Sequence, residues 1–448
     1  MAISSRPRVA VVTGAAGFIG MFVVRRLVAD GYHVFALIRG KAGHSAQDRL
    51  DELKETLELD PIEAERLHCI DCALGPTMDA DALVAGLKAA LDALGTKRID
   101  VVIHSAASLR QDHDRMKEER REGIRKTNIA NNLEGTTALL GALEKLMDDG
   151  SGKLGCPDSV RIVRPSIVAG RESNTGVMAL MTFLGRKTWG VPNHKLFALM
   201  ARFQKQLPMV GNPEGIMDVI DVQDVVTAMA AFVHADERDD EQVDQSRYTV
   251  GSVHYVSTAY VHGTRQGILL EELVVGKKDY PGEKQFNNSY EESKALTEQM
   301  VFEWFQGRGG TSERFVINNV TNAYSMTLEE WSFQLFRSLG WDTSFAKKLV
   351  WVQSVDELKE AVSKMRGGKG MLGKAWMTFW MRVYVLWAYL LRSSGTKFDT
   401  TNTKKCVDPS WTDKKVQRYF SFQVKSFGPT TSIYRRSKVP FWKRIWCF

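Results

Sequence analysis

The sequence TGAAGFIG occupies residues 13–20, directly after the apolar run VAVV at residues 9–12 and directly before MFVVRRL at residues 21–27. This order predicts a buried strand, a glycine-rich turn, and then a helix whose unpaired amide N–H groups face the turn. Such a helix start attracts phosphate, because its free N–H groups and the positive end of its dipole both favour an anion. The stretch therefore predicts a pyrophosphate site. The residues assigned to that site are Thr13, Gly14, Gly17, Phe18, Ile19 and Gly20.

A second apolar run, HVFALI at residues 33–38, ends at Arg39, where NAD-binding versions of such a turn place an Asp or Glu for the ribose hydroxyls. No acid stands at residues 39–41 (RGK). An arginine at this position can form charge-assisted hydrogen bonds with a 2′-phosphate, and Arg49 on the following segment is close enough in the chain to contribute. The sequence therefore favours NADP(H), with Arg39 and Arg49 as phosphate contacts. The alternative is that both arginines are ordinary solvated side chains.

The bulk composition indicates a globular chain with a full hydrophobic core. The chain has 448 residues, of which 44% are hydrophobic, and a formal net charge of +7, which predicts one large domain with an extension. No signal peptide precedes the first strand and the five cysteines are scattered, so we expect a cytoplasmic location. Cys69 and Cys72 form one C-x-x-C without a second pair or a histidine cluster, so no metal site is predicted. The basic residues form no nucleic-acid-binding motif, and no nucleic-acid partner is expected.

Strands and helices alternate along the first third of the chain, which is the pattern of a doubly wound α/β fold. The third and fourth strands are predicted at residues 67–71 (LHCID) and 99–107 (IDVVIHSAA). Three small residues at the end of the fourth strand leave space for a ribose and a nicotinamide: Ser105, Ala106 and Ala107. Residues 127–136 (TNIANNLEGT) are then predicted to open a long helix.

Groups suited to carbonyl reduction lie later in the chain. The sequence SYEESK at residues 289–294 places Tyr290 and Lys294 on one face of a helix, where the cation is expected to lower the pKa of the phenol. Such a phenol can protonate a carbonyl oxygen while a hydride reaches the carbon. Upstream, VSTAYV at residues 256–261 ends a strand with the hydroxyls of Ser257 and Thr258, which can hydrogen-bond the same oxygen.

Together these motifs resemble the extended short-chain dehydrogenase/reductase family, and within it the branch of fatty acyl-CoA reductases and thioester reductase domains. The similar stretches are TGAAGFIG (13–20), ALIRG (36–40), VVIHSAA (101–107), NLEGT (132–136), RIVRPSIVAG (161–170), VSTAYVHG (256–263) and SYEESK (289–294). The resemblance implies a doubly wound, mostly parallel Rossmann sheet. It also implies that Thr258, Tyr290 and Lys294 are catalytic, with Ser257 beside them.

The same resemblance assigns three further positions around the cofactor. It implies that Asp71 lies near the adenine and that Pro165 contacts the nicotinamide side. It implies that Asn132 is a structural or proton-relay neighbour of the site.

The order of two motifs departs from that family. In the family the Ser-Thr strand and the Tyr-x-x-x-Lys helix precede the Arg-Pro-Ser strand, whereas here RIVRPSIVAG at 161–170 precedes VSTAYVHG at 256–263. Block 161–253 stands where block 254–315 would normally be. The junctions fall just before strands, whose neighbouring starts lie only about 5 Å apart, so short loops can bridge the exchanged order. We expect permuted connections with the usual spatial sheet and an intact site. The competing expectation is an altered strand order with a damaged site.

The remaining chain is expected to serve the substrate and a surface. We predict a reductase domain at residues 1–340, with a Met-rich and aromatic substrate cover or ordinary helix core at about 171–215, and a helical C-terminal extension at residues 341–448. The apolar stretch within residues 374–392 carries a central Arg382 and reaches only about 26 Å as a helix, short of the ~30 Å bilayer core. Its aromatic face and its basic face favour a helix lying in the membrane interface, with a protein-buried helix as the alternative.

The sequence as a whole predicts an NADPH-dependent reductase. The expected substrate is an acyl thioester, either a fatty acyl-CoA or an acyl-carrier conjugate, or a long-chain carbonyl compound, and the expected product is an aldehyde or alcohol. Two other readings remain open at this point. One is a steroid- or sugar-type dehydrogenase or epimerase of the same family, and the other is a catalytically dead nucleotide-binding scaffold.

Overall fold

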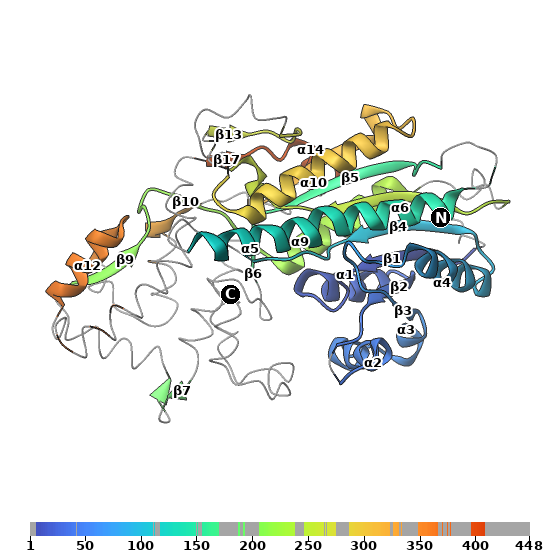
Figure 1. The fold of residues 1–448 in the computed structure, drawn as a ribbon, viewed down its shortest axis with the longest axis horizontal. Coiled ribbons are helices and arrows are strands. Elements are labelled where there is room, and N and C mark those ends of the chain that lie inside the picture. Colours follow the sequence, from blue (N-terminus) through green and yellow to red (C-terminus); the bar gives the residue numbers. More distant parts are fainter. Residues whose placement is uncertain are drawn as a thin grey trace.

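The computed structural model gives the arrangement of the chain in space (Figure 1). The residues that it describes form the continuous stretches 6–41, 43–110, 117–148, 155–169, 206–237, 246–263, 267–274, 286–322, 326–330, 348–365 and 396–407, together with a few short pieces between them. The predicted substrate cover falls mostly outside the described residues, and so does nearly all of the helix predicted at residues 374–392.

A parallel sheet of seven strands forms the centre of the fold. The strands are β1 (Val9–Thr13), β2 (His33–Ile38), β3 (Leu67–Asp71), β4 (Arg98–His104), β5 (Ser159–Pro165), β12 (Thr249–Val256) and β14 (Phe315–Val320). Their order across the sheet is β3-β2-β1-β4-β12-β5-β14. Every residue of β1 is buried, as expected for a parallel strand that is covered by helices on both faces.

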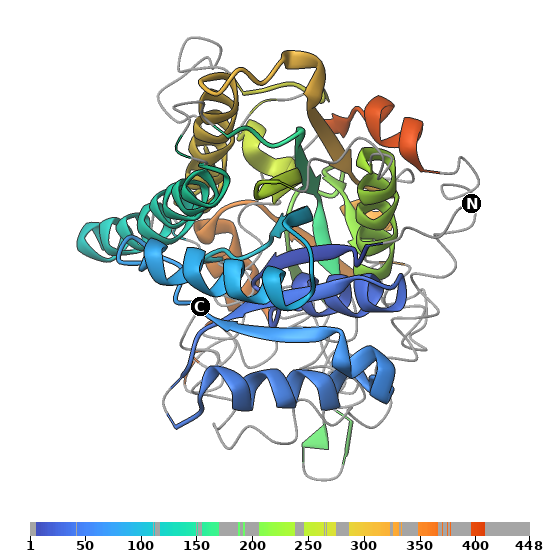
Figure 2. The ribbon, with the colours of Figure 1, turned by 90° about the vertical axis from the view of Figure 1, so that its right-hand side faces the viewer.

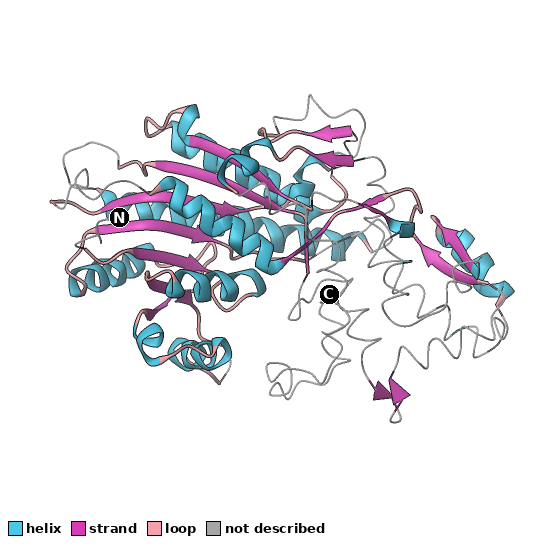
Figure 3. Cartoon of the chain, turned by 180° about the vertical axis from the view of Figure 1, so that it is seen from behind, coloured by secondary structure: helices cyan, strands magenta, loops and turns pink. Residues whose placement is uncertain are grey.

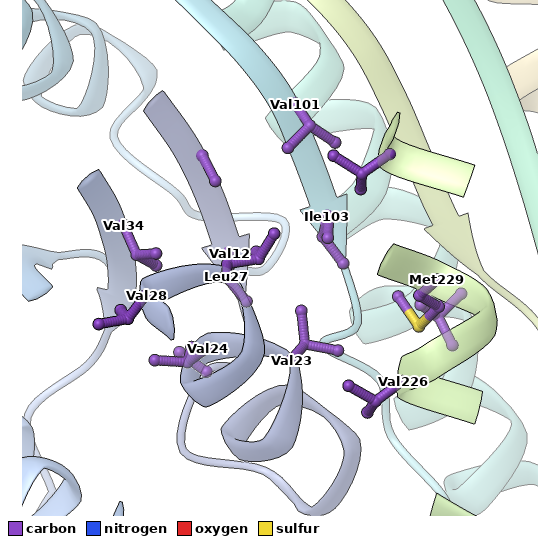
Figure 4. Close-up of a cluster of buried hydrophobic side chains, with 14 of the residues drawn as sticks. Val12, Val23, Val24, Leu27, Val28, Val34, Val101, Ile103, Val226 and Met229 are labelled. Atoms are coloured by element: carbon purple, nitrogen blue, oxygen red, sulfur yellow. The ribbon is translucent and has the colours of Figure 1, made fainter. Parts of the chain in front are cut away.

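Helices cover both faces of this sheet (Figure 2). One layer contains α1 (Phe18–Ala29), α2 (Ala46–Leu57) and α9 (Val222–Asp236), whose apolar residues pack in one buried cluster with the sheet. Figure 4 shows part of this cluster, in which Val23 and Leu27 of α1 and Val226 of α9 surround Val12 and Ile103. The opposite layer contains α4 (Ala80–Ala93), α6 (Gly135–Met147) and α10 (Ser289–Gln306), which contribute to a second cluster. The predicted doubly wound α/β fold is therefore confirmed.

The exchanged motif order is realised as permuted connections within this sheet. After β4 the chain skips the neighbouring position in the sheet and forms β5. It then returns through α9 and fills the skipped position, between β4 and β5, with β12. From β12 it passes through α10 to β14 at the edge of the sheet. Each crossover toward the β3 edge uses the α1, α2 and α9 layer, and each crossover toward the β14 edge uses the α4, α6 and α10 layer. All crossovers therefore keep one hand, as parallel connections require. The expected spatial sheet is thus present, because the return through α9 obeys the same rule as the ordinary connections.

The helix predicted to open at residues 127–136 begins earlier. α5 spans Glu118–Asn128, a π-helical turn follows at Ile129–Glu134, and α6 continues from Gly135. The sequence EERREGIRK at residues 118–126 has no apolar periodicity, which is the signal that such a prediction uses. The short helix α3 (Pro61–Glu65) precedes β3, with Asp60 and Glu63 forming a capping box at its start.

Smaller elements lie around the sheet, and Figure 3 shows them from behind. They are β6 (Ile167–Ala169) with β11 (Val219–Asp221), β9 (Leu207–Val210) with β16 (Leu349–Val352), β10 (Ile216–Met217) with β15 (Met326–Thr327), β13 (Gly267–Leu269) with β17 (Thr396–Phe398), and β7 (Lys187–Thr188) with β8 (Val191–Pro192). The helix α12 (Val355–Lys364) packs against β9 and β16, at a distance from the central sheet (Figure 1).

Part of the predicted C-terminal extension packs on the edge of the central sheet. The helix α14 (Thr401–Cys406) contacts β14, and the carboxylate of Glu271 accepts hydrogen bonds from the backbone N–H of Asn319 at 2.7 Å and from the hydroxyl of Thr403 at 3.0 Å. Residues 396–407 are thereby anchored to strand β14. Within the described part of the chain, no helix is both long and apolar enough to cross a membrane.

Candidate active site

The glycine-rich turn is packed so closely that side chains are excluded from it. Gly14 has φ +67°, and a Cβ atom placed there would lie 2.7 Å from the backbone nitrogen of Ala106. A Cβ atom on Gly20 would lie 2.1 Å from the carbonyl oxygen of Gly14. The N–H of Gly17 donates to that same carbonyl at 2.7 Å, which closes the turn. Glycine is therefore required at residues 14 and 20 by the backbone itself.

The start of α1 is open to an anion. Gly17 is the N-cap residue, so no side chain caps the first N–H groups of the helix, and no acidic residue lies in its first turn. These N–H groups belong to Phe18, Ile19 and Gly20 in the first turn of α1, which follows the glycine-rich turn after β1. A helix start without a capping side chain leaves its donors for a ligand, and a pyrophosphate fits their charge. The predicted pyrophosphate residues thus lie together in one cradle.

Residues assigned to the adenine end lie at the same edge of the sheet. Arg39 follows β2 and is exposed, and the Nη1 group of Arg49 donates to the carbonyl oxygen of Arg39 at 2.5 Å. Asp71 ends β3, where it pairs with Ile38, and it is exposed as well. Arg39, Arg49 and Asp71 are therefore neighbours on the surface beside the cradle. Their contact with a cofactor stays a prediction.

The end of β4 is fastened to the glycine turn by a chain of hydrogen bonds that the sequence did not predict. The hydroxyl of Thr13 lies 2.6 Å from Nδ1 of His104, and Nε2 of His104 lies 2.8 Å from the hydroxyl of Thr136. Burial, together with the nearby charge of Lys294, lowers the pKa of His104 to about 3, so the imidazole is neutral. The hydroxyl of Ser105 donates to the carbonyl oxygen of Thr13 at 2.7 Å. The small residues predicted to flank the cofactor are thus held directly against the cradle.

Lys294 connects helix α10 to the end of β12. Its Nζ donates to the carbonyl oxygen of Val256 at 2.7 Å and lies 4.6 Å from the centre of the Tyr255 ring. The side chain is only 2% exposed, and this burial lowers the pKa of Lys294 to about 7, against the opposing effect of the Glu298 carboxylate. Lys294 therefore titrates near neutral pH.

The expected effect of Lys294 on Tyr290 is not found. Burial raises the pKa of the Tyr290 phenol, and the carboxylate of Glu291 raises it further. The sequence-based expectation of a lowered pKa is wrong for the protein without a cofactor, because burial of the phenol dominates its pKa. The phenol therefore stays protonated at neutral pH, as a proton donor must.

Ser257 and Thr258 follow β12 directly. The hydroxyl oxygen of Ser257 is buried and has no hydrogen-bond partner among the described residues, which leaves it available to a ligand. The hydroxyl of Thr258 caps a short 3-10 turn at Ala259–His262 by accepting from the N–H of Tyr260 at 3.3 Å. Pro165 ends the adjacent strand β5 and is buried.

Asn132 lies between two helices. It sits in the π-helical turn, donates from Nδ2 to the hydroxyl of Ser293 at 2.9 Å and accepts from the N–H of Ser108 at 2.6 Å. One helical turn away, Asn128 donates to the hydroxyl of Ser289 at 3.0 Å. These contacts join α10 to α5 and to the loop after β4. The structure thus places Asn132 between α10 and the loop after β4, in a π-helical turn, a feature frequent at functional sites; a role beside the cofactor stays a prediction.

The predicted site residues therefore meet along one edge of the sheet. Thr13 pairs with His104, and His104 pairs with Tyr255, so the carboxyl ends of β1, β4 and β12 are level. Adjacent strands lie about 4.8 Å apart, which places the residues after β12 about 10 Å from the glycine turn. A nicotinamide dinucleotide that starts at the cradle spans such a distance. Among the described residues, no group of three or more His, Cys, Asp or Glu side chains is arranged to hold a metal.

Comparisons with known proteins agree with this geometry. The family model described as male sterility protein matches residues 12–140 and 212–312, together just over half of the chain. The unmatched stretch between them contains β5, the strand whose place in the chain is exchanged. A Drosophila melanogaster protein named "putative fatty acyl-CoA reductase" is 33% identical over 103 residues, which cover 22% of this chain and 20% of that protein. The chain thus matches only about a fifth of the length of that relative.

Two solved structures are among those that the chain matches over most of its length. The terminal R domain from the myxalamid PKS-NRPS pathway has a TM-score of 0.48 at 13% identity, over 95% of this chain and 91% of that one. The UDP-glucose 4-epimerase of Thermotoga maritima has a TM-score of 0.41 at 12% identity, over 94% and 98% of the two chains. On the strength of the family model, the chain belongs to the male sterility protein family.

Proposed function

We propose that the protein is an NADPH-dependent reductase that converts an acyl thioester, either a fatty acyl-CoA or an acyl-carrier conjugate, to the aldehyde or alcohol. One observation carries this proposal. The uncapped start of α1, the unpartnered hydroxyl of Ser257 and the amine of Lys294 at the end of β12 belong to one edge of the sheet. Family membership and the local resemblance to a protein named as a fatty acyl-CoA reductase support the substrate class.

The residues present fit a nicotinamide cofactor, which supplies a hydride to the carbonyl carbon when it is bound. Tyr290, whose raised pKa keeps it protonated, gives a proton to the carbonyl oxygen. The hydroxyls of Thr258 and Ser257 donate hydrogen bonds to that oxygen as negative charge develops on it. The amine of Lys294, at the end of β12, orients the ribose of the cofactor.

For a thioester, the balance of atoms and electrons is simple. The carbonyl carbon gains two electrons with the hydride, and the oxygen gains one proton, which gives a hemithioacetal. The carbon–sulfur bond then breaks, the thiol leaves with a proton, and the aldehyde remains. A second hydride and a second proton would reduce the aldehyde to the alcohol.

The proposed preference for NADPH over NADH rests on the two arginines beside the cradle. Arg39 is exposed at the end of β2, and its carbonyl oxygen accepts a hydrogen bond from the guanidinium of Arg49 at 2.5 Å. The two positively charged residues are therefore neighbours on the same surface. A 2′-phosphate carries the complementary charge. No acidic residue follows β2 at residues 39–41 to bind a free ribose hydroxyl.

A peripheral contact with a cytosolic membrane surface belongs to the same proposal. The alternation of tryptophan and basic residues within 374–392 supports it, since such a segment can lie in the interface with its aromatic side buried. A long-chain acyl substrate would reach the enzyme from the same surface.

The test is NADPH oxidation with a fatty acyl-CoA, an acyl-carrier protein and the free aldehyde, measured side by side with NADH as the matched cofactor. We expect oxidation of NADPH with at least one thioester, and release of free thiol in equal amount. Oxidation of NADPH with the free aldehyde but with neither thioester would show that the enzyme catalyses only the reduction of aldehyde to alcohol. Retained cofactor without net turnover on nucleotide sugars would indicate an epimerase, and NADPH binding without oxidation on any carbonyl would indicate a scaffold.

A further inference from the structure

A buried guanidinium group lies directly behind the candidate catalytic residues. Arg164 on β5 is fully buried, and its Nε and Nη2 donate to the two carboxylate oxygens of Glu298 at 2.9 and 2.5 Å. Its Nη1 lies 3.2 Å from Nε2 of His262, and its Nη2 also donates to the carbonyl oxygen of Glu272 at 2.9 Å. Glu298 and His262 are each 1% exposed. One side chain thus joins three separate segments of the chain.

Two of these segments, and the strand that carries Arg164 itself, lead to the site. Glu298 lies on α10 one turn after Lys294, on the helix that also carries Tyr290. His262 ends the short turn that Thr258 caps. Arg164 itself immediately precedes Pro165 at the end of β5. The relative position of the phenol, the amine and the Thr258 hydroxyl is therefore set through Arg164.

Stability alone does not account for such a pair. Taking a guanidinium and a carboxylate out of water is expensive, and well-packed apolar residues of similar volume are often as stable or more stable. The ion pair instead fixes the relative orientation of the two side chains, because the planar guanidinium binds both carboxylate oxygens in one geometry. It also leaves a further N–H that can donate to a third group. His262 is neutral, since burial lowers its pKa to about 3, so its Nε2 can accept the hydrogen bond from Arg164.

We propose that Arg164 is a positioning residue of the reductase, which holds the helix bearing Tyr290 and Lys294 against the turn bearing Thr258. This inference rests on the proposed function for its activity readout. Misplacing reacting groups by an ångström can lower turnover by about 100-fold, whereas the pyrophosphate contacts at the distant glycine turn, which supply much of the cofactor binding, stay in place. The signature of positioning is therefore a loss in kcat that is much larger than the loss in NADPH affinity.

The same strand provides a matched control. Arg161 lies three residues earlier on β5 and forms a similar two-pronged ion pair with Asp236 at 3.0 and 2.6 Å, with side chains 6% and 10% exposed. The guanidinium of Arg161 also lies over the ring of Phe232 on α9. This ion pair therefore faces the helix layer on the other side of the sheet from α10. The two pairs match in chemistry and burial but differ in what they hold.

The test compares two double variants, Arg164→Met/Glu298→Met and Arg161→Met/Asp236→Met. Removing both charges of each pair avoids an unpaired buried ion, so both proteins are expected to fold. We expect at least a 10-fold loss in kcat for the first double variant with NADPH affinity within about twofold of the parent, and near-normal kcat for the second. Arg164→Lys keeps the charge but loses the fork, and we expect its kcat to lie between the parent and the first double variant.

Amide hydrogen exchange over residues 257–263 and 289–294 gives a readout that does not need turnover. We expect faster exchange in these segments for the Arg164 double variant but not for the Arg161 double variant. This result supports the inference even if the parent protein reduces no carbonyl compound. A parent without activity would refute the proposed function but not the inference about Arg164. Unchanged kcat in a folded Arg164 double variant, or unchanged exchange where no activity exists, overturns the inference. Should that double variant not fold, parental kcat in Arg164→Lys overturns it.

Discussion

The buried amine of Lys294 should make the protein more stable as the pH rises, and replacing it by methionine should remove that dependence. The pKa of this amine is about 7 in the folded protein and 10.5 when it is free in solution. Between these values the unfolded chain binds a proton that the folded chain does not, so stability increases with pH at about 1.4 kcal/mol per pH unit. The burial cost is complete below pH 7 and amounts to about 5 kcal/mol.

The assay is urea unfolding of the parent and Lys294→Met at pH 6.5, 8 and 9.5, followed by tryptophan fluorescence. Lys294→Met also leaves the carbonyl oxygen of Val256 without its donor, which costs about 1–3 kcal/mol but does not depend on pH. The informative quantity is therefore the difference in unfolding free energy between the two proteins, and how that difference changes with pH. We expect the advantage of the variant to shrink by about 3 kcal/mol from pH 6.5 to pH 9.5.

Three other groups lie near the amine, and each could affect how its protonation changes with pH. His104 on β4 stays neutral across the range because its pKa is about 3, and the Tyr255 ring on β12 contributes only its face. The carboxylate of Glu298, one turn along α10, is held by Arg164 in both proteins. Lys359→Met, which removes an exposed amine on α12, is the control and should show no such slope. A difference between parent and Lys294→Met that is constant over this range would refute the reasoning.

The remaining predictions concern the chemistry, the cofactor and the membrane. Tyr290→Phe removes the proton donor but keeps the ring, so turnover should fall by roughly 10²–10⁴-fold with NADPH affinity unchanged; near-normal turnover would remove Tyr290 from the mechanism. Arg39→Asp should weaken NADPH binding and spare or improve NADH binding, whereas equal changes for the two cofactors would show that Arg39 does not contact the 2′-phosphate. The parent should sediment with anionic vesicles and be released only partly by high salt, and replacing Trp380 and Trp387 by Glu should free it with soluble-substrate turnover intact. A parent that never sediments with vesicles would contradict the membrane contact.

The sequence predicted the elements that local pattern controls. The apolar runs at residues 33–38 and 67–71 are β2 and β3 with those bounds, and the glycine turn lies between β1 and α1. The exchanged connections were also predictable, because each motif is typical of one position in the sheet. That assignment does not depend on where the motif occurs in the chain. A parallel strand carries that information in its own side chains, since both of its faces are buried.

Contacts between distant segments were not predictable in this way. His104 and Thr13 are 91 residues apart and Arg164 and Glu298 are 134 apart, and no local pattern connects the members of either pair. The direction of the Tyr290 pKa also depended on burial, which a helix-face argument does not include. Sequence reasoning therefore named the candidate site residues, whose roles stay predictions, whereas the hydrogen bonds and the pKa shifts around them required the fold.

The place of β12 has a consequence for how the protein is made. β5 ends at Pro165, but the strand that separates it from β4 begins only at Thr249. As the nascent chain leaves the ribosome, β4 and β5 are complete while the gap between them has nothing to fill it, and each presents an unpaired edge. Such edges are where growing chains pair wrongly or associate with one another. The centre of the sheet, where the candidate site lies, therefore cannot close until β12 has been made, long after the strands on both sides of it.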